Sequence, residues 1–256
     1  MKAEILNLLR GIEEKHSIQI VYACEVGSRA WGLEHRNSDY DVRFIFIYPI
    51  ETYLSLDEPL DVIDVQSKEI DCHGWDIKKT LKLFRKHNPT LLEWLHSPVV
   101  YQDSYEISKV LRSLNESNFQ IKPVLYHYVN MAKKNLEDLT KRNDSKQLIN
   151  IFRPILICKW ILTRNEFPPL QLKELIEPIH EQEVKITMYH IIDIKKKTLE
   201  ESSLQQLEFN HLQKWMTEEL RFIEESVSKL QEHSAMKVNM TREVNKVFRS
   251  FVLKSQ

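Results

Sequence analysis

The chain has 256 residues, of which 42% are hydrophobic and 29% are charged, the balance of an ordinary soluble globular protein. Its 36 basic and 37 acidic residues give a formal net charge of -1, which excludes a global basic field for nucleic acid, so any such surface has to be local. The length suffices for one large domain or two modest ones, with room for a buried core.

The first hundred residues have the pattern of a small α/β domain. Apolar side chains recur at helical spacing near the N-terminus, and stretches rich in β-branched and aromatic residues follow. The expected elements are, in chain order, a helix over residues 1–16, strands over 18–26 and 40–48 joined by a turn region with a short helix over 29–33, strands over 60–65 and 67–73, and helical periodicity from Trp75.

After Tyr101 the periodicity is helical almost to the end of the chain. Helices are expected over Tyr105–Leu114, Val124–Leu139, Leu148–Leu162, Leu172–His180, Glu183–Leu199 and Leu207–Leu230, and a basic amphipathic helix over Arg242–Lys254. The pattern therefore predicts an α/β domain over residues 1–101 and an all-α domain over residues 102–256.

Cysteine usage and the N-terminal segment bear on the compartment. The three cysteines, Cys24, Cys72 and Cys158, are far apart inside apolar segments, which suits neither a zinc cluster nor a disulfide framework and indicates a reducing environment. The N-terminus is charged throughout, unlike a signal peptide, and no stretch has the apolar length of a membrane span. A cytoplasmic protein without a membrane partner is expected.

Asp39 and Asp41 open the second expected strand. Because side chains alternate along a strand, the two carboxylates project from one face and repel each other. A divalent cation between them removes that repulsion, and Mg²⁺ is typically held by one or two carboxylates together with substrate phosphates. Asp71, on a later strand, supplies a third carboxylate, and three carboxylates can hold two ions about 4 Å apart. This arrangement predicts in-line nucleotidyl transfer, with one ion activating the attacking hydroxyl and the other stabilising the leaving pyrophosphate.

The Gly27-Ser28 turn follows the first strand, and its backbone N–H groups and hydroxyl are suited to hold a triphosphate. The alternative is that Ser38 and Asp39 only cap a turn while Asp41 is solvated, which is the commoner outcome for a bare Ser-Asp-x-Asp string. A glycine-serine turn, an acid pair opening the next strand and a later strand acid together favour the functional interpretation.

These residues also carry a resemblance. Gly27-Ser28-Arg29-Ala30-Trp31-Gly32, followed by Ser38-Asp39-Tyr40-Asp41-Val42-Arg43, resembles the motif of the DNA polymerase β-like nucleotidyltransferase superfamily. Within it, the chain is similar to the RNA-ligase-associated predicted nucleotidyltransferases (the RlaP or YcgL-like family). Further family-like strings are Gly74–Lys79, Asn88-Pro89, Leu92–Leu95, Ser97–Tyr101, His127-Tyr128, Met131–Asn135, Arg153-Pro154 and Pro168-Pro169.

The resemblance implies an α+β fold, in which a small mixed sheet with flanking helices precedes a helical domain. It implies a nucleoside triphosphate (NTP) donor and two Mg²⁺ or Mn²⁺ ions, with Asp39, Asp41 and Asp71 as metal ligands and catalytic residues. Gly27 and Ser28 are implied as phosphate binders. Asp71 is preferred to Asp76 as the third ligand, because it stands within a strand, whereas Asp76 begins a helix and is placed to cap it. Val26 departs from the family pattern, where a small polar residue is common.

Three basic residues are secondary candidates for binding the nucleotide. Arg29 and Arg43 flank the acids, and a guanidinium matches phosphate geometry. Arg43 shares the parity of the aspartates on its strand, so an ion pair with Asp41 or Asp71 is the alternative. Lys78 opens a helix, where the positive end of the helix dipole disfavours cations, so its presence there suggests an anionic partner. A solvated surface lysine is the alternative.

The acceptor is left open by the residues. The family's association with RNA ligases favours an RNA end and an RNA-processing partner. The second hypothesis is transfer to a protein or a small molecule, as antitoxin-like and antibiotic-modifying relatives do. The third is a non-catalytic nucleotide- or RNA-binding regulator, against which the intact set of three acids speaks. The sequence does not indicate the preferred base, the oligomeric state or the role of the C-terminal basic helix.

Overall fold

The computed structural model describes residues 1–139, 145–197, 206–230 and 237–254. The chain divides into two compact units, which are described separately. The first unit comprises Met1–Ala30, Ser38–Asn118 and His233–Gln256, and the second comprises Trp31–Asn37 and Phe119–Glu232. The units thus interleave along the chain, whereas the sequence pattern indicated a single division after residue 101.

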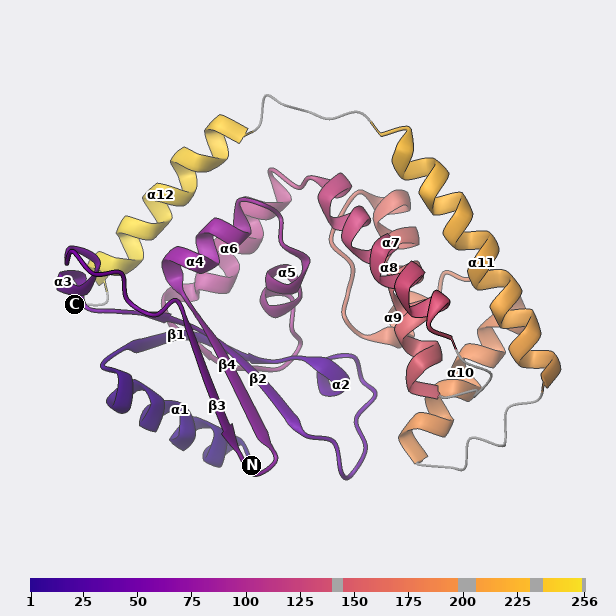
Figure 1. The fold of residues 1–256 in the computed structure, drawn as a ribbon, viewed down its shortest axis with the longest axis horizontal. Helices are drawn as coiled ribbons and strands as arrows, with labels where there is room; N and C mark the ends of the chain where they lie inside the picture. Colours follow the sequence, from indigo (N-terminus) through magenta and orange to yellow (C-terminus); the bar gives the residue numbers. More distant parts are fainter. Residues whose placement is uncertain (140–144, 198–205, 231–236, 255–256) are drawn as a thin grey trace. The chain divides into compact units, whose positions relative to one another are not determined.

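The first unit is built on a five-stranded mixed sheet (Figure 1). Its strands are β1 (Gln19–Glu25), β2 (Tyr40–Ile47), β3 (Val62–Ser67), β4 (Ile70–Asp76) and β5 (Val100–Asp103). They lie in the order β3-β4-β2-β1-β5, and β2 and β4 are parallel while the other neighbours are antiparallel. The parallel pairing of β2 with β4 determines which residues lie together in the candidate site, because parallel neighbours begin at the same edge of a sheet.

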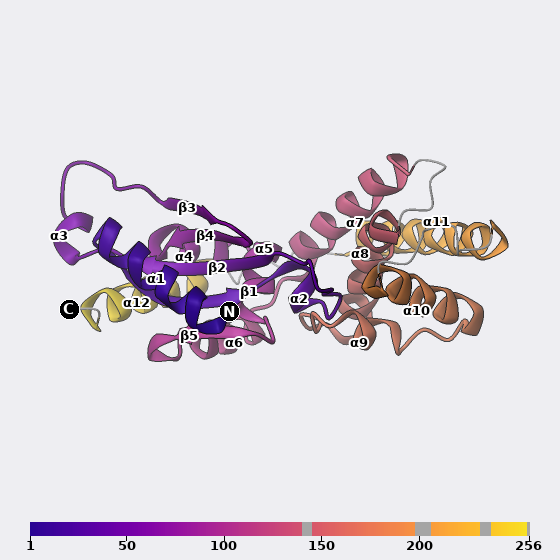
Figure 2. The same ribbon diagram turned by 90° about the horizontal axis from the view of Figure 1, so that it is seen from below.

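Helices cover both faces of this sheet (Figures 1 and 2). The helices of the unit are α1 (Lys2–His16), α2 (Gly27–Ala30), α3 (Ile50–Tyr53), α4 (Ile77–Phe84), α5 (Pro89–Leu95), the 3-10 turn η1 (Ser104–Glu106), α6 (Ile107–Glu116) and α12 (Lys237–Lys254). Helix α1 inserts Ile5 and Leu9 into a core that includes Val42, Phe44 and Phe46 of β2. Helices α4, α5 and α6 lie on the opposite face.

Several boundaries differ from those expected. Strand β3 begins two residues later than expected. It ends at Ser67, and β4 begins three residues later than expected, because the chain reverses at Lys68, whose φ of 50° closes the turn between paired Ser67 and Ile70. Strand β4 also continues through Trp75, where a helix was expected. At Gly74 the strand can pair with β2 because the missing side chain leaves room for the Phe44 ring. A Cβ at position 74 would collide with that ring. Strand β5 was not foreseen at all.

The short helix after β1 also differs from its expected position. It spans Gly27–Ala30 instead of residues 29–33, because Gly32, with φ 71°, ends it with a turn. In the second unit, the helix beginning at Leu172 ends at Ile176, four residues earlier than expected. Glu177 still has helical backbone angles, and Pro178 follows it, whose ring lacks the N–H that a further helical hydrogen bond would need.

The second unit is helical. It consists of α7 (Ile121–Glu137), α8 (Ser145–Arg164), α9 (Leu172–Ile176), α10 (Gln182–Lys197) and α11 (Gln206–Ser228). Helix α8 is buried around most of its circumference and contacts the other four helices. The helix expected over Glu183–Leu199 extends into residues 198 and 199, which lie outside the described residues. The α+β fold, with a mixed sheet and a helical part, is confirmed.

Two further observations concern the state of the cysteines and the apolar character of the helices. Cys24, Cys72 and Cys158 are buried thiols that form no disulfide. Among the described residues, no helix combines the length and the apolar character that a membrane crossing requires.

Candidate active site

The pairing of β2 with β4 brings two of the predicted acids together. Asp41 and Asp71 are direct partners in this parallel register. Their parity places both on the face of the sheet opposite α1, and their side chains are 32% and 47% exposed. Asp39 precedes the first residue of β2 and is exposed, so it lies in the loop and not, as expected, within the strand.

Charge repulsion links all three acids. Burial raises the pKa of Asp41, the Arg43 guanidinium lowers it, and the Asp71 and Asp39 carboxylates each raise it. Asp41 is therefore the acid at which the fields of the other two converge. This is the electrostatic situation that a bound cation relieves.

Gly27 lies directly against the carboxylate of Asp41. It begins α2 with a φ of 65°, and a Cβ added to it would overlap Oδ2 of Asp41. The neighbouring backbone N–H of Val26 donates to the Asp41 carbonyl at 2.9 Å. Ser28 follows in α2 and is half-buried. The glycine-serine turn and the second acid are thus adjacent in space, as the sequence predicted.

Arg43 lies between the two acids of the strands. Its Nη1 is 3.0 Å from Oδ2 of Asp71, and its Nη2 is 3.4 Å from Oδ1 of Asp41. Nη1 also donates to the Asp71 and Val42 carbonyls, and the side chain is only 18% exposed. The ion-pair alternative for Arg43 is therefore what the structure contains.

Arg29 is committed to the loop that carries Asp39. Its Nη2 donates to the Ser38 carbonyl at 2.7 Å and its Nε to the Asp39 carbonyl at 3.2 Å. The guanidinium also stacks over the Tyr40 ring, 3.6 Å from its centroid. These contacts tie α2 to the start of β2, so Arg29 holds the glycine-serine turn and the acid-bearing loop in one arrangement.

Lys78 is not brought to the aspartates. It lies in the first turn of α4, beyond the end of β4. Asp76, the residue that caps that helix, is five positions of about 3.3 Å each along the strand from Asp71. Oδ1 of Asp76 accepts the Lys78 N–H at 2.8 Å, and Oδ2 accepts the Tyr53 hydroxyl. Asp76 is a helix cap, as predicted.

Glu25, which the sequence analysis did not single out, is the most buried acid of the site. It is fully buried at the end of β1, and burial raises its pKa. Its Oε1 accepts the Asp41 N–H at 2.8 Å, and its Oε2 accepts the Tyr101 hydroxyl. A carboxylate ending an otherwise apolar strand directly before a glycine-serine turn was the available signal. Its role is visible only with β2 and β5 in place.

The donor set matches a hard divalent cation, since Asp39, Asp41 and Asp71 offer only carboxylate oxygens. In the side-chain positions of the described residues, no three His, Cys, Asp or Glu side chains are grouped closely enough to hold an ion. The Arg43 guanidinium occupies the place between two of the acids and compensates their charge. Rotation of the half-exposed Asp71 side chain away from Arg43 is the rearrangement that a cation would require.

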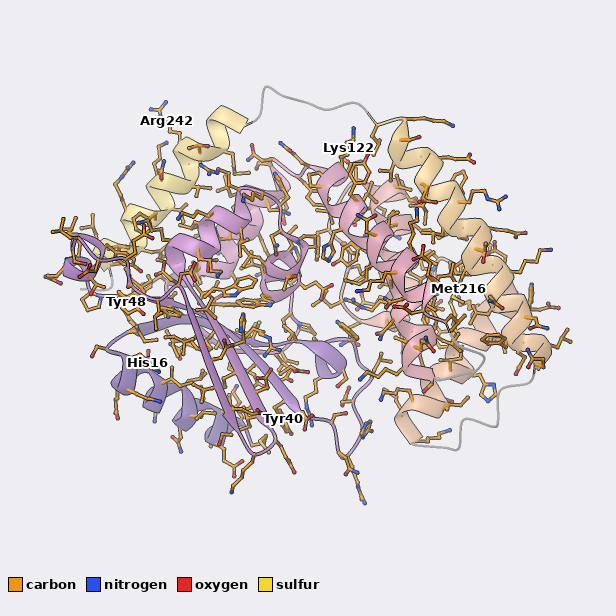
Figure 3. All side chains as sticks on the ribbon, viewed as in Figure 1. His16, Tyr40, Tyr48, Lys122, Met216 and Arg242 are labelled. Carbon is orange, nitrogen blue, oxygen red and sulfur yellow. The ribbon has the colours of Figure 1, made fainter. Side chains whose placement is uncertain are left out.

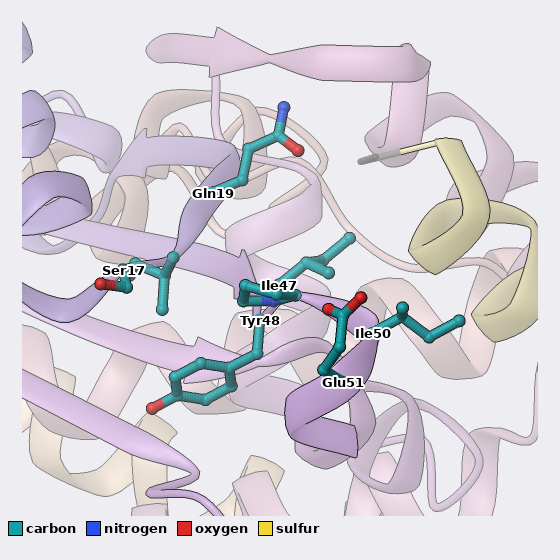
Figure 4. A pocket seen from close by; sticks show the side chains of 8 residues that line it. Ser17, Gln19, Ile47, Tyr48, Ile50 and Glu51 are labelled. Carbon is teal, nitrogen blue, oxygen red and sulfur yellow. The ribbon is translucent and has the colours of Figure 1, made fainter. Parts of the chain in front are cut away.

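A separate pocket lies at the other end of the sheet (Figure 4). It has a volume of about 550 Å³ and is lined by residues 17–19 and 47–51, among them Gln19, Tyr48 and Glu51. Figure 3 labels Tyr40, beside the aspartates, and Tyr48, beside this pocket, at opposite ends of β2. The pocket is therefore not part of the aspartate site.

Comparison with known proteins covers nearly the whole chain. Residues 1–250 match the family described as "RNA repair pathway DNA polymerase beta family". A protein of Bacillus subtilis (strain 168) named "Uncharacterized protein YcgL" is 36% identical over 255 residues, which is 96% of this chain and 95% of that protein. Both similarities extend well beyond the motifs of the first hundred residues.

Proposed function

This chain belongs to the RNA repair pathway DNA polymerase beta family, as its motifs predicted, and on that premise we propose that it is a metal-dependent nucleotidyltransferase. The reaction moves a nucleoside monophosphate from an NTP to an acceptor hydroxyl or phosphate. The acceptor oxygen forms a bond to the α-phosphorus, and the bond to pyrophosphate breaks. The observation that supports the proposal best is the register of β2 and β4, which pairs Asp41 with Asp71 beside Gly27.

Each residue has a role in this proposal. Asp39, Asp41 and Asp71 hold Mg²⁺ or Mn²⁺, which when bound supplies positive charge for the triphosphate and lowers the pKa of the attacking group. Gly27 and Ser28 bind the triphosphate through backbone N–H groups and the hydroxyl, at a turn where the absent Cβ permits close approach. We assign Arg29 to positioning, because its donors already serve the loop backbone.

Arg43 is proposed to change partners during the reaction cycle. Without nucleotide it neutralises Asp41 and Asp71, and its planar guanidinium is equally suited to a phosphate. With Asp41 and Asp71 holding a cation, the Arg43 guanidinium would be available to bind the triphosphate. Lys78, at the far end of β4, has no part in this site.

An RNA end is the proposed acceptor class, because the family is described as acting in RNA repair. Transfer to a protein or small molecule uses the same carboxylates and is the alternative. A non-catalytic nucleotide-binding regulator is the third candidate. The paired acids speak against it, since a strand can lose an exposed carboxylate without losing its place in the sheet.

Incubation with α-labelled NTPs, Mg²⁺ and either RNA, protein or small-molecule acceptors tests the proposal. We expect labelled RNA from the wild type and at least a 1,000-fold slower reaction from Asp41→Asn, since loss of the metal ligand removes several kcal/mol of transition-state stabilisation. Asp57→Asn, at an exposed position outside the site, is the control and should react at the wild-type rate. Labelling of protein or small molecule alone replaces the RNA assignment, and an unimpaired Asp41→Asn rules out the proposed site.

A further inference from the structure

Two segments from distant parts of the sequence concentrate the positive charge of the first unit. Residues 77–92 contain five basic residues and no acid, and α12 contains five basic residues and one acid, Glu243. Together they hold ten of the chain's 36 basic residues and one of its 37 acidic residues. A chain that is close to neutral overall is therefore strongly basic in these two segments.

The fold places these segments side by side. Helix α12 packs against α4 on the sheet face opposite α1 (Figures 1 and 2). The Phe248 ring of α12 meets the Tyr53 ring edge-on at 5.5 Å, and Phe251 lies 6.4 Å from the Tyr105 ring. The Tyr105 hydroxyl donates to the Lys254 carbonyl at 3.1 Å. The apolar side of α12 is thus covered by its own unit, and its basic side remains exposed.

The exposed charges form one stripe on each segment, which we call the α4–α12 basic surface. Lys78, Lys82 and Arg85 follow one another at helical spacing on and just after α4, and Arg242, Lys246 and Arg249 repeat the same spacing on α12. Figure 3 shows Arg242 pointing away from the body of the unit. Four residues of helix rise correspond to about 6 Å between successive charges.

Most of these charges are not neutralised by the protein. Within the described part of the chain, ion pairs join Lys79 to Asp61 and Lys246 to Glu243, but none joins an acid to Lys78, Lys82, Arg85, Arg242 or Arg249. Lys78 also lies at the positive end of a helix dipole, where a cation is disfavoured. Single exposed lysines are commonly just solvated. Two rows of exposed like charges on helices that contact each other create a local positive potential, which a bound anion would neutralise.

We propose that the α4–α12 basic surface binds the phosphate backbone of a single-stranded nucleic acid. Regularly spaced cations on two adjacent elements match a regularly spaced polyanion, and binding requires no base contacts. A membrane surface is the less suitable partner, because the apolar residues of α12 that would enter lipid are used in packing. This inference rests on the proposed function in one respect: the bound strand is taken to be the acceptor RNA.

The test measures binding separately from transfer. Anisotropy of a labelled single-stranded RNA is recorded against salt concentration for Asp41→Asn and for the same protein with Lys82→Gln, Arg242→Gln and Arg249→Gln. The loss of three phosphate contacts should reduce the slope of log affinity against log salt concentration, the salt slope, by about 2 in magnitude. The affinity at 0.1 M salt should fall by roughly 100-fold. The matched control replaces Lys2, Arg10 and Lys15, which are exposed on α1, by Gln and should leave both quantities unchanged.

Two outcomes would overturn the inference. One is an RNA affinity and a salt slope that the α4–α12 substitutions leave unchanged while circular dichroism shows both variants folded. The other is binding of anionic vesicles or of an acidic peptide, but not of RNA, through the same residues. Failure of the transfer assay with intact, surface-dependent RNA binding would instead count against the proposed function alone.

Discussion

At the scale of single residues, the site depends on an absent side chain as much as on the acids. Gly27 combines a left-handed φ, which disfavours a Cβ, with direct contact to Asp41, which leaves no room for one. We expect Gly27→Ala to lower the unfolding free energy by about 1–2 kcal/mol, from the backbone alone. The proposed metal site predicts that Mg²⁺ raises the thermal midpoint of the wild type, and because Asp41 must also move, this rise should be lost in Gly27→Ala. Urea and thermal unfolding with and without Mg²⁺ measure both effects.

Gly11 provides the matched control for this substitution. It lies within α1, where an added Cβ meets nothing within 4 Å. Gly11→Ala should therefore stabilise the protein, by about 0.5–1 kcal/mol, because alanine has the higher helix propensity. It should leave the Mg²⁺ effect intact. Equal responses of the two variants would mean that Gly27 has no special relation to the aspartate site.

The two-residue parity of a strand was applied to Asp39 and Asp41, but Asp39 precedes β2. The pairing of Asp41 with Asp71 comes from the register of β2 with β4, which no local pattern specifies. The sequence could not predict that Arg43 would lie between them, since an arginine of the same parity serves a phosphate or a carboxylate equally well. Glu25 was not predicted as a site residue, for a different reason. Its two partners, the Asp41 N–H and the Tyr101 hydroxyl, come from strands that are distant in the sequence, so only the assembled sheet brings them together.

At the scale of elements, Asp76 illustrates how one acid serves a helix and not the site. Its carboxylate accepts the Lys78 N–H, and burial raises its pKa from an ordinary value of 3.8. Loss of the cap in Asp76→Ala should cost about 1 kcal/mol of stability. In Asp76→Asn the cap oxygen is retained and the titration is removed. Neither variant should abolish nucleotidyl transfer, whereas Asp71→Asn should.

The pH dependence of this carboxyl has a definite sign. The pKa of Asp76 is higher in the folded protein than in the unfolded chain, so folding favours its protonated carboxyl. The resulting contribution to the free energy of unfolding is complete below about pH 3.8 and is lost as the pH rises through the folded-state pKa. The stability of Asp76→Asn relative to the wild type should therefore increase between pH 4 and neutrality. Urea midpoints across this range measure it, and a constant or falling difference would contradict the assignment.

The boundaries of elements were the least predictable feature. The hydrophobic pattern identified β1, β2 and most helices, but β4 was expected to end before Trp75 because helical periodicity begins there. In the fold, Gly74 makes room for Phe44, and Trp75 stacks on Trp94 of α5 with ring centroids 3.9 Å apart. Both contacts join residues from different elements, so no local sequence pattern predicts them.

At the scale of the whole molecule, the sequence motif of the candidate site runs through segments of both units. The glycine-serine turn ends at Ala30 and the acid-bearing strand is approached at Ser38, both in the first unit, while the intervening residues 31–37 belong to the second. Within the second unit, Trp31 accepts the Leu172 N–H at its carbonyl, and Arg153 of α8 stacks over its ring at 3.9 Å. The connection between turn and acids is therefore anchored in the helical unit.

This anchoring can be tested by replacing Arg153 with an uncharged residue. Arg153→Met should cost about 0.5–2 kcal/mol from the lost stacking on Trp31. It should also increase amide hydrogen exchange in residues 31–37 and slow nucleotidyl transfer, because both ends of this segment bear site residues. Arg164→Met is the control, since Arg164 stacks in the same way over Trp160 of the same helix, at 3.8 Å, but contacts no part of the loop. If both variants exchange and react alike, the loop does not depend on its packing against α8.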